Sequence, residues 1–169
     1  YNPDVWILPL DGSREAYNVS QHPDWDGNGQ ISADGKVLAF MSSREGDNAD
    51  IYMVFLDKVL EDASSLERDV YFDEQAAELK KLQAKAAEYR EAASAYLLAK
   101  WRGEEPDGED LEEEFPYPKL EIDYDDLYKR TRTVTRELGN QYYFALAPSG
   151  QRIAYTNNDG RVVFVDWDG

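Results

Sequence analysis

A repeated pair of short apolar runs is the feature that most constrains what this chain can fold into. Residues 37–40 and 51–56 read VLAF and IYMVFL, and each run follows a polar loop containing Asp and Gly. Runs of this length between turn-forming loops are typical of β-strands. Residues 146–155 line up with 31–40, and a further strand-like run follows at 161–165. This repetition predicts a repeated sheet unit.

The last strand of the unit occurs three times, as DVWILPLDG, DIYMVFLDK and GRVVFVDWDG, starting at Asp4, Asp50 and Gly160. The first two copies are 46 positions apart, which is the length of one four-stranded propeller blade. The last two are 110 positions apart, which leaves an insertion of roughly 65 residues. The expected fold is therefore mainly β, with about two four-stranded antiparallel propeller blades interrupted by a long α-helical insertion. It is a partial propeller, because a closed one needs at least four blades.

Three regions follow from this pattern: blade strands in 1–58, a helical insertion and acidic linker in 59–119, and a second blade in 120–169. The segment from Glu74 to Trp101 contains neither Gly nor Pro and predicts a helix of about 42 Å. Asp73 and Glu74 are its expected N-terminal cap, and 64–67 is expected to cap a separate short turn.

Apolar residues at alternating spacings of three and four predict a seam along this helix, formed by Leu79, Leu82, Ala86, Tyr89, Ala93 and Tyr96. The seam is expected to pack on the sheets or on a partner helix; a lone solvated helix and a dimerisation or docking arm are the alternatives.

Two segments resemble known families. NVSQH at 18–22, Trp25-Asp26-Gly27, and SADGKVLAF at 32–40 together resemble the repeat of TolB-type β-propellers. LEIDYDDLYKR at 120–130 is similar to the segment that opens a blade in tricorn-protease-like proteins. The resemblance implies a fragment of a bacterial tricorn-like peptidase.

In that family the propellers are non-catalytic and lie beside a serine peptidase domain. The resemblance thus implies a segment that gates or guides peptide substrates or supports assembly, within a parent protein that is a serine-type peptidase. Its expected partners are a peptide or protein substrate, further propeller blades and a peptidase domain of the same polypeptide. The alternative is a TolB-like periplasmic protein-binding propeller without peptidase activity. The sequence leaves the compartment open between bacterial cytoplasm and periplasm.

The residues themselves predict no catalytic site and no cofactor. His22 is the only histidine, so the chain has no second one for a typical zinc cluster, and no Ser/His/Asp set with a plausible oxyanion loop is evident. There is also no phosphate-binding glycine loop. We therefore expect any chemistry to reside in the parent protein and not in these residues.

One loop matches most of a calcium-binding pattern. Asp24, Asp26 and Asn28 occupy the first three ligand positions of D-x-[DN]-x-[DN]-G, and Gly29 takes the turn position. The twelfth position is Gly35, where a bidentate Glu is required, and neither flank has a helical pattern. The favoured interpretation is a turn connecting two strands, and a weak calcium site in a non-helical loop is the alternative.

Charge excludes two classes of partner. The formal net charge is −17, which disfavours binding to nucleic acid phosphates and to anionic lipid. No run approaches the 18 apolar residues that indicate a membrane span.

The acidic charge is concentrated in one linker. Twelve acidic residues and one lysine lie between Glu104 and Asp126, so this linker is expected to be solvated, or to act as an acidic flap toward charged peptides. The chain has no cysteine, which excludes disulfides without selecting a compartment.

Overall fold

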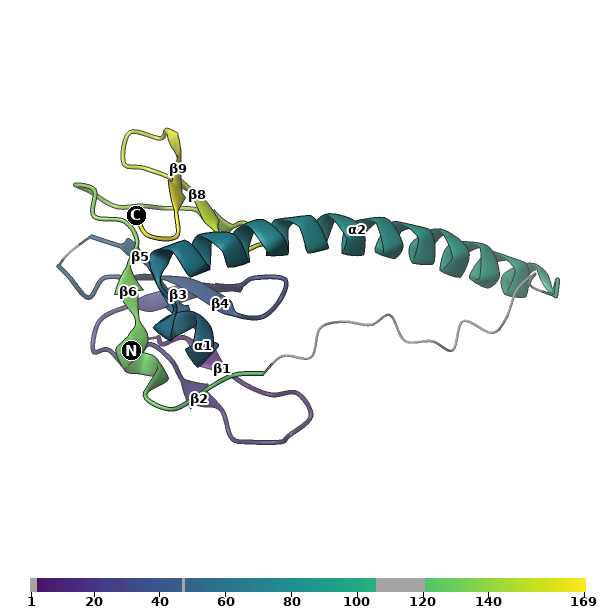
Figure 1. The fold of residues 1–169 in the computed structure, drawn as a ribbon, viewed down its shortest axis with the longest axis horizontal. Helices are drawn as coiled ribbons and strands as arrows, with labels where there is room; N and C mark the ends of the chain where they lie inside the picture. Colours follow the sequence, from purple (N-terminus) through teal and green to yellow (C-terminus); the bar gives the residue numbers. More distant parts are fainter. Residues whose placement is uncertain (1–2, 47, 106–120) are drawn as a thin grey trace.

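The computed structural model describes residues 3–46, 48–105 and 121–169. Within them the protein is sheet-rich, with antiparallel sheets of two, four and three strands and one long helix that extends away from the sheets (Figure 1). The elements in chain order are β1 (Trp6–Ile7), β2 (Tyr17–Asn18), β3 (Asp26–Ile31), β4 (Val37–Ser42), β5 (Asp50–Phe55), α1 (Lys58–Asp62), α2 (Ser65–Arg102), a 3-10 helix (Leu127–Arg130), β6 (Arg132–Thr133), β7 (Phe144–Leu146), β8 (Arg152–Thr156) and β9 (Val162–Asp166). The predicted antiparallel sheets and long helix are confirmed.

The central sheet has the order β3-β4-β5-β6, and its last strand comes from the far side of the helical insertion. The sequence predicts that residues 120–169 form the second blade. Instead β6 pairs with β5, with Tyr52 opposite Thr133, and the next sheet begins at β7. An alternating pattern shows that a segment forms a strand, but it does not show which sheet edge the strand joins.

Both faces of the central sheet are buried, because every residue of β4 and β5 is buried. Alternate residues of a strand point to opposite faces. Val37, Ala39, Ile51 and Met53 therefore belong to a core shared with the β7-β8-β9 sheet and the start of α2. Leu38, Phe40, Tyr52 and Val54 belong to a second core shared with the β1-β2 sheet. The sheet is thus the middle layer of three.

Helix α2 is longer than predicted, since it begins at Ser65 and not near Glu74. Its cap is Ser64, whose hydroxyl accepts from the Glu67 amide while the Glu67 carboxylate accepts from the Ser64 amide. This capping box was assigned to a separate short turn, because the sequence does not show that one helix continues through Asp73. The helix runs to Arg102 and is capped by Gly103, with φ of 73°, which agrees with the predicted end at Trp101. The seam residues are half-buried and the α2 positions between them are exposed.

Phe72 attaches α2 to the sheets. It is the one residue of the helix that is buried. Its ring centroid lies 6.3 Å from that of Phe55 on the central sheet and 6.0 Å from that of Trp167 after β9. One aromatic side chain therefore joins the helix to two sheets.

We predict that Phe72→Ala lowers the free energy of unfolding by about 3–5 kcal/mol, because it leaves a cavity where three elements meet. Val70→Ala, at a neighbouring α2 position that is 51% exposed, should cost less than about 1 kcal/mol. Urea denaturation followed by far-UV circular dichroism measures both. Equal losses in the two variants would show that Phe72 does not anchor the helix.

Candidate binding groove at the foot of the helical arm

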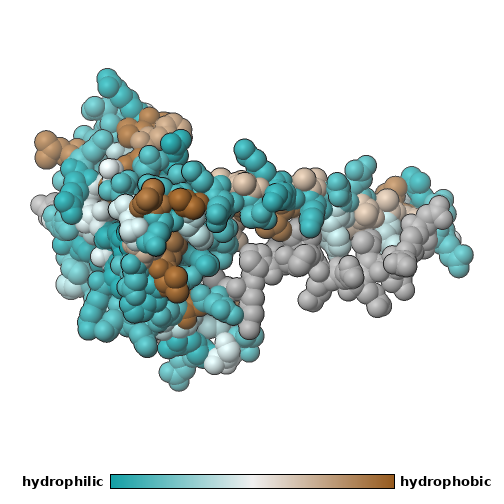
Figure 2. All heavy atoms as spheres, viewed as in Figure 1, coloured by the Kyte–Doolittle hydropathy of each residue, from teal (hydrophilic) through white to brown (hydrophobic). Residues whose placement is uncertain are grey.

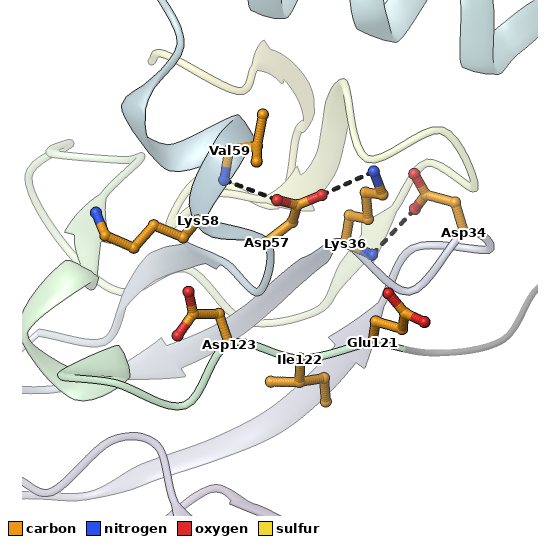
Figure 3. A pocket seen from close by; sticks show the side chains of 8 residues that line it. All are labelled: Asp34, Lys36, Asp57, Lys58, Val59, Glu121, Ile122 and Asp123. Carbon is orange, nitrogen blue, oxygen red and sulfur yellow. Dashed lines mark hydrogen bonds and ion pairs between the residues drawn. The ribbon is translucent and has the colours of Figure 1, made fainter.

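A two-part groove lies where α1 and the start of α2 meet the sheets, and we call it the arm-foot groove. One hollow has a volume of about 450 Å³ and is lined by Asp34, Lys36, Asp57, Lys58, Val59, Glu121, Ile122 and Asp123 (Figure 3). The other has a volume of about 570 Å³ and is lined by Lys36, Asp57, Val59, Leu60, Asp62, Ala63, Glu67 and Tyr71. Lys36, Asp57 and Val59 line both hollows, so the two are adjacent.

Asp57 is the central charged residue of the groove. It follows β5 and caps α1, because its Oδ1 accepts from the Val59 amide at 2.8 Å. Its Oδ2 lies 2.8 Å from Lys36 Nζ, and both contacts are visible in Figure 3. Partial burial acts to raise the pKa of Asp57. The hydrogen bonds from Lys36, Val59 and Leu60 outweigh it, so the pKa is lowered from the ordinary value.

A second set of contacts ties the β3–β4 turn to α2. The Tyr71 hydroxyl donates a hydrogen bond to Asp34 Oδ2, and Lys36 Nζ lies 5.4 Å from the centre of the Tyr71 ring. Asp34 Oδ1 also accepts from the Lys36 amide at 3.2 Å, which holds the turn closed. Gly35 adopts φ of 75° in this turn, a conformation that strongly favours glycine. The turn, α1 and α2 are therefore joined by one network of polar contacts.

The groove is predominantly acidic and partly apolar. Six carboxylates line it against the ammonium groups of Lys36 and Lys58. Lys58 pairs with Asp62 at 2.7 Å and Lys36 pairs with Asp57. The other four carboxylates have no ion pair among the described residues: Asp34 and Glu67, which accept hydrogen bonds, and Glu121 and Asp123. Val59 is 80% exposed between the hollows. This combination is suited to noncovalent binding of a positively charged, partly apolar ligand.

The groove offers binding groups, and the hydroxyl in its lining is that of Tyr71, which donates to Asp34. The lining contains neither histidine, serine nor threonine, so it offers no serine or threonine nucleophile beside a histidine base. Across the described ranges, no group of three or more His, Cys, Asp or Glu side chains is arranged to hold a metal ion. The expectation that these residues carry no chemistry remains a prediction.

The sequence did not identify this groove. Asp34-Gly35-Lys36 was interpreted as a turn, and Asp57 as the end of a strand. The acidic segment that includes Glu121 and Asp123 was interpreted as a solvated linker or an acidic flap. Asp57 is the one residue that could have indicated the groove from the sequence. An Asp that follows a strand and precedes a helical run is a typical N-cap. Nothing in the sequence indicates that Glu121 returns beside it.

The three candidate calcium ligands lie in and before β3. Asp24 is exposed and lies 3.5 Å from His22 Nδ1, whereas Asp26 is fully buried and pairs with Arg44 at 3.1 Å. Asn28 has φ of 55°, and its side-chain amide lies 3.4 Å from Met41 Sδ. The segment from Asp26 onward is a strand with a register shift between Gly27 and Gln30, not the simple turn that was expected. The three side chains thus contact three different partners, and among the described residues they do not form a group arranged to hold a metal ion.

We predict that millimolar calcium leaves the melting temperature unchanged. A bound ion would raise it, because ligands that bind only the folded state stabilise that state. Differential scanning fluorimetry with and without calcium makes the measurement, and magnesium is the matched control. A calcium-specific increase that Asp24→Asn abolishes would establish the weak calcium site.

Comparison of the chain with protein-family models, with curated protein sequences and with solved structures gave no match. No described helix is long and apolar enough to cross a membrane. The antiparallel sheets and the groove are therefore the basis for any functional proposal.

We predict that Asp57→Asn destabilises the protein by about 1 kcal/mol at pH 7, because it weakens a helix cap and removes an ion pair. The folded-state pKa of Asp57 is lowered, so its stabilisation is complete above the ordinary aspartate pKa of about 3.9 and is lost as the pH falls through the lower folded value. Urea unfolding at pH 7 and near pH 2.5 measures this. A difference between wild type and variant that is independent of pH would contradict the assignment.

Proposed function

We propose that this chain is a non-catalytic, β-propeller-like segment of a tricorn-like serine peptidase, and that it helps to guide peptide substrates or to support assembly. The observation that carries the proposal is the arrangement of the three sheets. They follow one another in sequence, and each apolar face between two sheets is made from alternate residues of the neighbouring strands. Successive blades of a propeller pack in this manner.

A direct link between neighbouring sheets supports this arrangement. Gln30, on the first strand of the central sheet, donates to the Phe144 carbonyl at 2.8 Å and accepts from the Leu146 amide at 2.9 Å. Both partners lie on β7, the first strand of the following sheet. The first strands of the two sheets are thus adjacent, as innermost strands are in a propeller. The central sheet also has the four-stranded antiparallel order expected of a blade.

The arm-foot groove supports the peptide-guiding part of the proposal. A peptide carries amide groups and side chains of mixed character, and the groove offers carboxylates beside the exposed side chain of Val59. It lies at the junction of a rigid sheet with a protruding helix, a position where binding residues are held firmly. Peptides with Lys or Arg side chains fit its charge best.

The second candidate is a TolB-like protein-binding propeller without peptidase activity. The same sheets and groove serve that function equally well, because a fold does not determine an activity. The two candidates differ in one property that can be measured, which is whether the natural polypeptide carries a reactive serine.

The test is covalent labelling of the natural polypeptide, isolated from its own cells, with a fluorophosphonate probe for serine hydrolases. We expect labelling at a serine outside residues 1–169, because the sequence predicts no Ser/His/Asp set with an oxyanion loop within them. A heat-denatured sample is the control for nonspecific reaction. Absence of labelling in the folded polypeptide would exclude the peptidase and favour the binding propeller.

A further inference from the structure

Asn28 is an exposed polar residue with an unusual backbone conformation. Hydrophilic side chains cover most of the surface that Figure 2 shows, so exposure alone does not indicate a site. Asn28 lies in β3 and has φ of 55°, in the left-handed region that residues other than glycine rarely adopt. The next residue is Gly29, which is exposed as well. Asn28-Gly29 is the only Asn-Gly pair in the sequence.

A bulge in β3 places this pair outside the regular ladder of the central sheet. The register shifts by one residue between Gly27 and Gln30, so that Asn28 and Gly29 together face a single residue of β4. A bulge of this type disrupts the ladder locally and bends the strand. The backbone of the pair is therefore less constrained than that of the strand on either side.

The bulge faces a sheet that the chain itself contains. The side-chain amide of Asn28 lies 3.4 Å from Met41 Sδ, and Met41 belongs to the core shared with the β7-β8-β9 sheet. Gln30, two residues further along β3, makes the two hydrogen bonds to β7. Asn28 is therefore exposed at the junction of the central sheet with the sheet that follows it.

The side chain of Asn28 is held more weakly than those of other asparagines. Its polar partner is the Met41 thioether, which is a weak acceptor. A main-chain amide donates a hydrogen bond to the side chain of three others, which are Asn18, Asn140 and Asn157. Asn28 alone precedes a glycine. Because glycine has no Cβ, another group can approach its backbone nitrogen closely.

We propose that Asn28 is a site of spontaneous deamidation in the folded protein, and that the reaction loosens the junction between the central sheet and the β7-β8-β9 sheet. The backbone nitrogen of Gly29 forms a bond to Asn28 Cγ, and the side-chain nitrogen leaves as ammonia with the proton from the Gly29 amide. The product is a succinimide ring. Water then opens the ring at either carbonyl, which gives aspartate or isoaspartate at position 28.

The isoaspartate product changes the path of the strand. It inserts one extra atom into the backbone between Asn28 and Gly29. Gln30 then shifts relative to β7, where it donates to the Phe144 carbonyl at 2.8 Å and accepts from the Leu146 amide at 2.9 Å. Hydrogen bonds weaken steeply when their geometry is lost, so the two sheets are held less tightly in the aged protein. This inference does not depend on peptidase activity.

Ageing of the folded chain tests the proposal. The 169-residue chain is incubated in mildly alkaline buffer beside a sample unfolded in guanidinium chloride, and peptide mapping by mass spectrometry measures deamidation at each asparagine. In the folded sample Asn28 should be converted several-fold faster than any other asparagine. An Asn28 rate more than about tenfold below its rate in the unfolded sample would overturn the proposal, because the fold would then raise the barrier. Equally fast conversion of another asparagine in the folded sample would also overturn it.

Asn28→Gly is the matched control, because glycine adopts the same φ and has no side-chain amide to lose. Its melting temperature should stay constant during the incubation, whereas that of the wild type should fall as isoaspartate accumulates. Asn28→Asp carries the charge of the other product without the extra backbone atom, so it should melt at a higher temperature than the isoaspartate form purified from the aged sample. Equal melting temperatures of these two proteins, or a wild type that ages without any decrease, would overturn the proposed effect on the junction.

Discussion

Burial of the central sheet on both faces is the constraint on which the rest of the structure depends. All residues of β4 and β5 are buried, and their alternate side chains enter two separate cores. A sheet of this composition cannot have one face in water, because both faces carry large apolar side chains. The β1-β2 sheet and the β7-β8-β9 sheet are therefore required on either side. The three-layer arrangement is a direct consequence of that requirement.

The helical insertion uses the same core for its attachment. Only the first part of α2 contacts the sheets, through Phe72 between Phe55 and Trp167, and the rest extends outward as an arm (Figure 1). Around this apolar anchor, polar contacts from Lys36, Asp57 and Tyr71 fix the direction in which the helix leaves. The arm-foot groove lies among these contacts. Its charged side chains thus have a structural role, and the exposed carboxylates among them are available to a ligand.

The proposed function rests on the way in which neighbouring sheets are ordered and linked. The propeller-like segment of a peptidase is supported by the order of the sheets, by the Gln30 link to β7 and by the resemblance of two sequence segments to known families.

The sequence by itself determined the local elements. Strands at 37–42, 50–55 and 152–156, the turn at Asp34-Gly35 and the helix end at Gly103 all follow from apolar periodicity and glycine placement. Tertiary structure decided what depends on distant partners: β6 joins β5, one helix continues from Ser65 through Asp73, and Asp26 pairs with Arg44 inside a strand. It also brought Glu121 beside Asp57, which lies 64 positions earlier in the chain. Local sequence patterns determine the conformation of each segment. Pairing between distant segments is different, because it depends on which sheet edges and buried charges still lack a partner once the layers have packed.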